Sequence, residues 1–172
     1  MKHDLARQQA TALGGEGSES SDLGPLEVNV LFTGAQATRA ALRAATGLAA
    51  DLSAAIRVKA AIAVPFALPL DHPQVSVSFT EEVLSALVSE FEQNSLDITA
   101  HLYLSRNRVE TFLQILPPNS LVVLAGRKRP WSTPESRIAR RLQSEGHRVV
   151  FIPVQRGEQE RGQSSRRLVG TR

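Results

Sequence analysis

The fold is decided by the stretch Leu121-Val122-Val123-Leu124-Ala125-Gly126, which leads through a basic segment and a helix into Val149-Val150-Phe151-Ile152-Pro153-Val154. Both segments are apolar and rich in branched side chains, so each predicts a strand buried in a sheet. Between them, Gly126-Arg127-Lys128-Arg129 predicts a basic turn after the first strand. A strand, a glycine turn and a helix N-terminus in this order are typical of anion or nucleotide sites in open α/β sheets.

The helix between these strands is expected to run from about Ser132 to Ser144. Ser132 and Glu135 have the spacing of a capping box, in which both side chains satisfy backbone amides at the helix start. Pro134 suits the first helical turn, and Gly146 suits the end of the helix. The segment therefore predicts a complete strand-helix-strand unit.

Strands and helices alternate through the remainder of residues 26–154. Branched apolar runs predict strands, and apolar residues at helical spacing predict helices. We expect strands over 26–32, 56–64 and 96–104, and helices over 36–52, 78–91 and 108–116. This alternation predicts an α/β fold, a three-layer α/β/α open sandwich in which a five-stranded parallel sheet carries helices on both faces.

Two of these helices are predicted in more detail. Ser78 and Glu81 have capping-box spacing, so Ser78 is expected to open the helix that follows. In the first helix, apolar residues recur at helical spacing and predict one buried stripe. The stripe consists of Leu42, Ala45, Ala49 and Leu52, with Leu48 beside it.

The two ends of the chain differ from residues 26–154 in composition. Residues 1–25 and 155–172 are expected to be disordered, because their Gly, Ser and charged residues bury too little apolar surface to offset the entropy of ordering. Residues 1–126 carry 8 Lys/Arg and 13 Asp/Glu, a net charge of −5. Residues 127–172 carry 12 Lys/Arg and 4 Asp/Glu, a net charge of +8. Such a basic end attracts phosphate, nucleic acid or anionic membrane surfaces.

Composition excludes several classes of protein. The chain has no cysteine, so disulfides, thiolate metal sites and cysteine nucleophiles are absent. It has no apolar run of about 18 residues that predicts a membrane-spanning helix. The first residues lack the apolar core of a secretory signal, and we therefore expect a cytoplasmic protein.

Three features together resemble the universal stress protein domain. They are the strand, short turn and helix start in the stretch Val30-Leu31-Phe32-Thr33-Gly34-Ala35-Gln36-Ala37-Thr38, the prolines after the second strand, and Ser120–Gly126 with the last helix and strand. The resemblance covers nearly all of residues 26–154. It implies the sheet order 3-2-1-4-5, a homodimer formed through the last strand, and a regulatory or adaptor role, in some members as the partner of a transporter.

The chain departs from the family at the nucleotide site. ATP-binding members carry an acidic residue at the end of the first strand, where this chain has Thr33. They also carry two glycines and a long loop before the last helix. Here Gly126 matches the first glycine, Arg129 replaces the second, and the loop is short. A side chain at a glycine position blocks close backbone approach to phosphate. We therefore expect no cofactor, neither ATP nor another adenine nucleotide, to bind in the usual way.

The alternative is a sensor of a nucleotide or a phosphate anion. The cations of the predicted turn lie beside a helix N-terminus, where free amides favour negative charge. The competing interpretation is a charged surface turn near a dimer interface, with Trp131 as a packing residue rather than a stacking platform. The candidate ligand-binding residues are Thr33, Gly34, Gly126, Arg127, Arg129, Ser132 and Thr133.

The last helix and last strand carry the remaining candidates. Arg137, Arg140, Arg141 and Arg148 predict a basic face, which with the C-terminal segment offers weak nucleic-acid binding as a third function. Because no aromatic residues interleave with them, we expect a solvated face instead, with Ile138 and Leu142 turned to the core. The candidate dimer interface consists of Arg148, Val150, Ile152 and Val154, on an expected edge strand.

Catalytic and metal sites are not expected. The four histidines are scattered without metal-ligand spacing, and no carboxylate cluster accompanies them. No G-x-S-x-G elbow or paired carboxylate supports nucleophilic or acid–base catalysis. The sequence thus predicts a binding, regulatory or adaptor domain rather than an enzyme.

Overall fold

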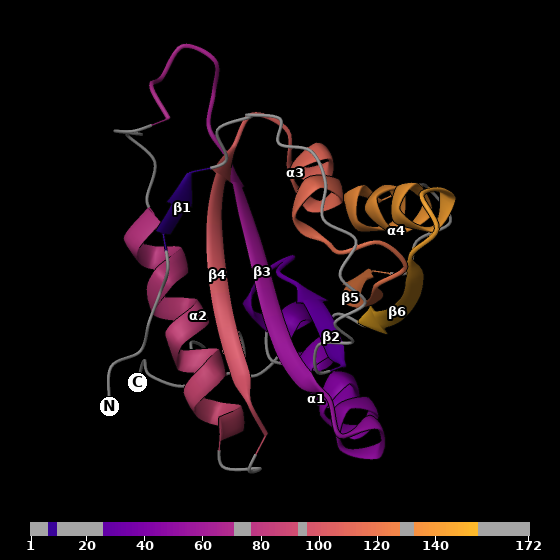
Figure 1. Cartoon of the computed structure of the whole chain (residues 1–172). Coiled ribbons are helices and arrows are strands. Elements are labelled where there is room, and N and C mark those ends of the chain that lie inside the picture. Colours follow the sequence, from indigo (N-terminus) through magenta and orange to yellow (C-terminus); the bar gives the residue numbers. More distant parts are fainter. Residues whose placement is uncertain (1–6, 10–25, 71–76, 93–95, 128–132, 155–172) are drawn as a thin grey trace, which may run out of the picture.

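The computed structural model describes residues 26–70, 77–92, 96–127 and 133–154, and the backbone of residues 7–9. Its strands form one parallel sheet in the order β1-β4-β3-β2-β5-β6 (Figure 1). In chain order the elements are β1 (Arg7–Gln9), β2 (Glu27–Leu31), α1 (Ala35–Leu52), β3 (Ala55–Ala63), α2 (Val77–Phe91), β4 (Ile98–Ser105), α3 (Arg108–Ile115), β5 (Leu121–Arg127), α4 (Pro134–Ser144) and β6 (Arg148–Val154).

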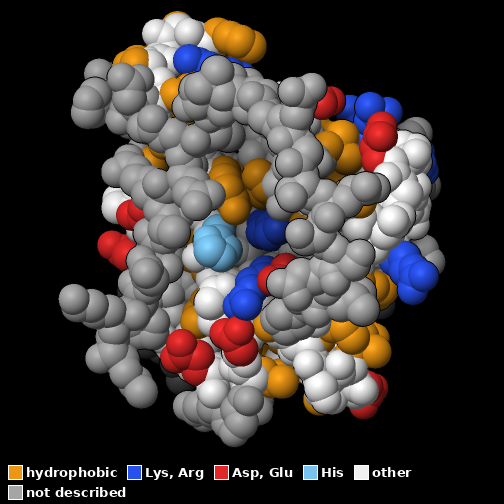
Figure 2. Space-filling view, viewed as in Figure 1, with side chains coloured by type: hydrophobic (Ala, Val, Ile, Leu, Met, Phe, Trp, Pro, Cys, Tyr) orange, Lys and Arg blue, Asp and Glu red, His pale blue; other side chains and the backbone are white. Residues whose placement is uncertain are grey.

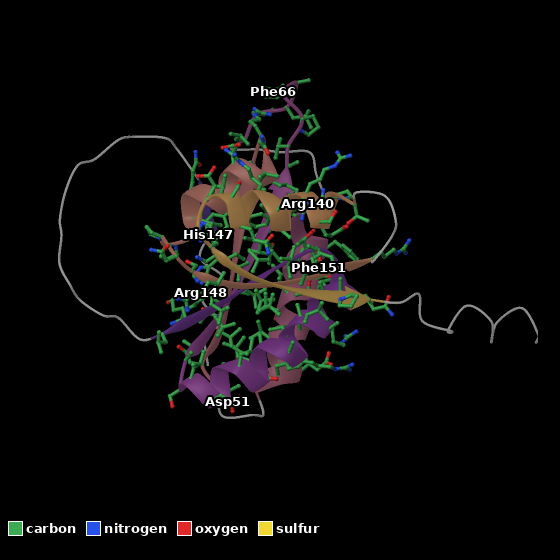
Figure 3. All side chains as sticks on the ribbon, turned by 90° about the vertical axis from the view of Figure 1, so that its right-hand side faces the viewer. Asp51, Phe66, Arg140, His147, Arg148 and Phe151 are labelled. Atoms are coloured by element: carbon green, nitrogen blue, oxygen red, sulfur yellow. The ribbon has the colours of Figure 1, made fainter. Side chains whose placement is uncertain are left out.

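The predicted α/β sandwich and its strand order are confirmed. Without β1, the order β4-β3-β2-β5-β6 is the predicted 3-2-1-4-5. Helices α1 and α2 contact each other on one face of the sheet, and α3 and α4 contact each other on the opposite face. Figure 3 shows β6, which carries Phe151, between α4 with Arg140 on one side and α1 with Asp51 on the other.

The sheet separates two apolar cores. Successive residues of a strand point to opposite faces, so a strand that is covered on both faces needs a continuous apolar run. In β5, Val123 and Ala125 belong to the core under α1 and α2, and Val122 and Leu124 belong to the core under α3 and α4. All four side chains are fully buried. The apolar run Val122–Ala125 is therefore the centre of both cores.

Strand β1 lies at the sheet edge next to β4, and the sequence did not predict it. Residues 1–25 were expected to be disordered; the structure describes Arg7–Gln9 of this segment as a strand, and the others lie outside the described residues. Arg7 pairs with Leu102 and Gln9 with Leu104 in parallel register. Backbone groups of an open sheet edge pair with any extended segment, so a polar sequence forms this strand without an apolar pattern.

Helix α1 packs its predicted stripe on the sheet except at the last turn. Leu42, Ala45 and Ala49 are fully buried, whereas Leu52 is 45% exposed. The prediction for Leu52 is wrong because the helix ends there: Ser53 takes a left-handed conformation with φ of 50° and turns the chain toward β3. The alanines of the stripe allow the helix to lie close to the sheet.

Two helices do not begin at the predicted caps. Helix α2 starts at Val77, which is buried, so Ser78 lies inside the helix rather than at its N-cap. In α4 the N-cap is Thr133, whose hydroxyl accepts a hydrogen bond from the Ser136 amide at 3.2 Å. The capping box predicted for Ser132 and Glu135 is therefore wrong. A cap at Thr133 places Pro134 at the first helical position, where its fixed φ and missing amide are best tolerated.

Candidate functional site

A crevice is expected where β2 and β5 lie side by side and end. From β2 the chain proceeds to β3 and β4 on one side of β2, and it then crosses to β5 and β6 on the other side. Open α/β sheets bind ligands at the carboxyl ends of strands at such a switch point. The loop after β2, the end of β5 and the N-termini of α3 and α4 surround this position.

Thr33 links the end of β2 to the end of β5 by a hydrogen bond. Its hydroxyl donates a hydrogen bond to the carbonyl of Ala125 at 2.7 Å, and its amide donates to Oγ1 of Thr38 at 3.2 Å. Gly34 follows with φ of 138°, a conformation that L side chains rarely adopt. The turn from β2 into α1 is therefore tied to β5 by protein groups, and the Thr33 hydroxyl is already bound.

Gly126 belongs to strand β5 and does not form the predicted turn. It pairs with Pro153, and Arg127 after it pairs with Val154. A Cβ added at Gly126 would lie 2.7 Å from Cβ of Glu135 and 3.2 Å from the Phe151 ring. The glycine is thus required because α4 approaches β5 closely, rather than because the chain turns there.

The remaining predicted ligand residues are only partly described. Arg127 is exposed at the end of β5, and Thr133 is half-buried at the N-terminus of α4. Residues 128–132, which include Arg129, Trp131 and Ser132, lie outside the described residues. The structure therefore brings Thr33 to the end of β5 and Gly126 to the start of α4. It does not test the ligand role of any of these residues.

Arg108 lies at the carboxyl end of β2 and was not among the residues predicted from the sequence. One guanidinium nitrogen donates to the carbonyl of Phe32 at 3.0 Å, while the buried Nε has no hydrogen-bond partner within the described residues. Burial lowers the pKa of Arg108 from its usual range, and Glu135 opposes this effect. The available signal was its position: Asn107 caps α3 just after a buried strand ends, so Arg108 starts a helix at the carboxyl edge.

Arg106 organises the loop that follows β3. Its guanidinium donates to the carbonyls of Val64, Pro65 and Leu68, and it lies 5.3 Å from the centre of the Phe66 ring. Phe66 is 85% exposed at the tip of this loop. The predicted proline-containing loop is thus held by one side chain from the end of β4.

Strand β6 forms the opposite edge of the sheet from β1. Among the described residues, β6 pairs with β5 alone. The side chains of Val150, Ile152 and Val154 are half-buried against the core under α1, whereas Arg148 is exposed. These four residues are the predicted dimer interface, and the structure places all of them on an edge strand.

The predicted basic face lies on α4. Arg137, Arg140 and Arg141 are exposed, and Arg141 forms an ion pair with Glu145 at 2.9 Å. Ile138 and Leu142 are buried on the other side of the helix, as predicted. Within the described ranges, no group of His, Asp and Glu side chains is arranged to hold a metal ion. The helices in the same ranges are too short or too polar to cross a membrane.

Comparison with solved structures defines the fold. A universal stress protein from Archaeoglobus fulgidus matches 74% of this chain and 93% of its own, with a TM-score of 0.57 and 15% identity. A universal stress family protein from Burkholderia pseudomallei matches 74% of this chain and 96% of its own, with a TM-score of 0.53 and 23% identity. A universal stress protein solved in complex with cAMP matches 76% of this chain and 98% of its own, with a TM-score of 0.51 and 14% identity.

The fold of residues 26–154 is therefore that of the universal stress proteins, as the sequence motifs predicted. No protein-family model and no curated protein sequence matches the chain.

Proposed function

We propose that this chain is a universal-stress-like regulatory or adaptor domain that works as a homodimer, with β6 of one copy paired to β6 of the other. The observation that carries the proposal is the edge of β6 that faces away from β5, which is open in the part of the chain that the structure describes. It is seven residues long and has half-buried apolar side chains on both faces. A long apolar edge strand without a covering element favours pairing with another chain.

The direction of the backbone groups on β6 supports this assignment. The amide of Arg148 donates to the carbonyl of Ser120 at 2.9 Å, so the backbone groups of Arg148 face β5. Because these groups alternate along a strand, those of Val149 and Phe151 face the open edge. Pro153 has the same parity, so its missing amide costs no hydrogen bond to β5.

A two-fold symmetric antiparallel contact satisfies these groups. Val149 and Phe151 of one copy each offer an amide and a carbonyl to the same residues of a second copy. The interface residues Val150, Ile152 and Val154 extend the core under α1 of each copy toward the other copy. Arg148 lies at the end of the strand, where its charge stays in solvent.

A proline substitution tests the edge specifically. Val149→Pro removes an amide that faces the open edge and leaves the ladder to β5 intact. Val149→Ala is the matched control, because it shortens the same side chain and keeps the amide. We expect Val149→Ala to remain a dimer by light scattering coupled to chromatography, and Val149→Pro to dissociate at least about tenfold more readily, as expected for lost hydrogen bonds. If both variants have the association state of the unaltered chain, β6 is not the interface.

The same proposal expects no ATP binding of the usual kind. Glu135 covers Gly126 at the place where a glycine loop would approach phosphate, and the Thr33 hydroxyl is engaged with Ala125. These contacts support a domain that keeps the fold without the family's ATP loop. The proposal assigns no reaction to the domain.

A sensor of a nucleotide or phosphate anion is the second candidate function. Arg108 supports it, because its buried Nε has no partner within the described residues at the carboxyl ends of β2 and β5. The structural neighbour solved with cAMP supports a search among adenine nucleotides. Thermal shifts with cAMP, AMP, ATP and inorganic phosphate test it, with Arg108→Gln against the exposed control Arg140→Gln. A saturable shift that is lost only in Arg108→Gln supports the sensor; no shift at millimolar ligand rejects it.

A further inference from the structure

The faces of β2, β3 and β4 turned toward α3 carry a polar cluster away from the crevice. Lys59 pairs with His101, and Arg57 pairs with both Asn29 and Thr99, in parallel register. Residues paired in this way point to the same face of a sheet. These residues lie on the face of the sheet that α3 covers, because the Lys59 ammonium donates to the carbonyl of Ile115 in α3 at 2.8 Å. We define the polar sheet face as Asn29, Arg57, Lys59, Thr99, His101 and Tyr103.

The carboxylates near this face are already committed to Arg57. Its guanidinium contacts Glu27 at 3.2 Å, Asp97 at 3.0 Å and the Thr99 hydroxyl at 2.9 Å. Figure 2 shows this side of the molecule, where Lys and Arg side chains, Asp and Glu side chains and a histidine gather over β3 and β4. The acidic groups therefore balance Arg57 and leave the charge of Lys59 without a matching carboxylate.

Lys59 is buried without a carboxylate partner. It is 7% exposed, and its ammonium donates to the carbonyl of Ile115 at the C-terminus of α3; no carboxylate of the described residues lies within ion-pair distance. Burial lowers the pKa of Lys59, Glu27 opposes this effect and Arg57 adds to it. A buried ammonium is costly unless it is paired with an anion. The Lys59 ammonium thus leaves a positive charge on this face that an anion from outside the chain could balance.

The neighbouring groups are suited to bind the rest of such a molecule. His101 and Tyr103 are adjacent on the face, with ring centres 6.5 Å apart, and each offers a polar hydrogen. Asn29 is 1% exposed, and its side-chain carbonyl has no hydrogen-bond partner within the described residues. An anion that also carries a hydroxyl or amino group would satisfy both Lys59 and Asn29.

We propose that the polar sheet face is a second ligand site, which binds a small anion with a phosphate or carboxylate group and a hydrogen-bond donor. Lys59 binds the charged group, His101 and Tyr103 donate to its oxygens, and Asn29 accepts from the hydroxyl or amino group. Arg57 is held in place by its carboxylates and closes the site at the amino end of the strands. The site is independent of the Gly126 crevice and of dimerisation.

Histidine-ring nuclear magnetic resonance on the full chain tests the proposal. The probes are inorganic phosphate, glycerol 3-phosphate, which joins a phosphate to hydroxyls, and lactate, which joins a carboxylate to one. We expect saturable shifts of the His101 ring signals with at least one of the last two probes. Signals of His147, which is buried at the start of β6, serve as the internal control. Preference for glycerol 3-phosphate or for lactate identifies the anionic group.

Variants separate this site from a general attraction of anions. Lys59→Met keeps most of the side-chain length without the charge and should weaken binding about tenfold or more, the value of a lost charged hydrogen bond. Arg140→Gln, which removes an exposed charge from α4, should leave the affinity within about twofold. Because Lys59 also binds the end of α3, Tyr103→Phe provides a second test if Lys59→Met does not fold. Unmoved His101 signals with all three probes, or unchanged affinity in Lys59→Met, would overturn the proposal.

Discussion

Two sequence patterns predicted different roles for Gly126. A glycine after a buried strand predicted a turn, and the resemblance predicted a phosphate contact. Its neighbours assign it another role, because Cβ of Glu135 lies where a side chain at this position would project. The sequence could not distinguish these roles, since close packing depends on where α4 lies on β5.

Substitution of Gly126 measures this packing directly. Gly126→Ala forces Glu135 and Phe151 to move, and we expect the free energy of unfolding to fall by about 1–3 kcal/mol, as for overpacked sites. Gly47→Ala is the matched control, because nothing lies within 4 Å of the added methyl in the middle of α1. It should stabilise by about 0.5–1 kcal/mol through helix propensity. Urea denaturation of both variants checks this, and equal effects would contradict the packing role.

His101 predicts how stability depends on pH. Burial first, then Lys59 and Arg57, lowers the pKa of His101 below its usual 6.5, with Glu27 opposing. The unfolded chain therefore binds the proton more tightly than the folded chain. As pH falls through 6.5 toward the lowered folded pKa, His101 should subtract stability, and above 6.5 it should have no effect. The difference between the unaltered chain and His101→Gln, measured by urea denaturation from pH 8 to 5, should appear only in that acid range.

At the scale of single elements, the sequence predicted which segments are helices better than where each helix begins. Periodicity fixes a helix because its apolar face must meet the core. A start is selected among adjacent residues by side-chain hydrogen bonds, and Ser132 and Thr133 are both good caps. The choice of Thr133 depends on Pro134 and on the reciprocal bond between Thr133 and Ser136.

The N-cap of α4 can be tested by removing one hydroxyl. Thr133→Ala leaves the Ser136 amide without its acceptor and should cost about 1 kcal/mol of stability. Thr133→Ser keeps the hydroxyl and should retain most of that stability. Thermal unfolding of the pair checks the prediction. If the alanine and serine variants unfold at the same temperature, the Thr133 bond does not contribute to helix α4.

Candidate site residues were less predictable than elements. Thr33, Gly34 and Gly126 were identified from the strand ends because parallel strands bring their carboxyl ends to one edge. Arg108 and Lys59 were not identified. Their roles depend on contacts with Phe32 and Ile115, which are far from them in the sequence. Contacts between residues so far apart in the sequence can be identified only once the pairing of the strands is known.

At the scale of the whole molecule, the parallel sheet with helices on both faces followed from the alternation of elements. Short right-handed connections leave few arrangements for such a chain, and the resemblance to universal stress proteins selected one of them. Strand β1 was missed because it is held to β4 by backbone pairing and not by an apolar pattern. Sequence patterns report burial, so an edge strand with polar residues gives no signal.

The layered sheet predicts a gradient of hydrogen exchange. Strands β2, β3 and β5 are paired on both sides and buried, so their amides should exchange slowest. Amides of Val149 and Phe151 should exchange fast in dilute protein and become protected as the concentration rises into the dimeric range. Mass spectrometry at two concentrations measures this change. Equal exchange of these two amides at both concentrations would contradict pairing through β6.

The two outer strands of the sheet differ in length, with seven residues in β6 and three in β1. If β6 pairs with β6, the combined sheet of two copies ends on β1 at both margins. Among the described residues, β1 offers three residues at that margin against seven in β6, so a third copy finds fewer backbone groups to pair with there. This difference between the two margins favours a closed dimer over a growing fibre.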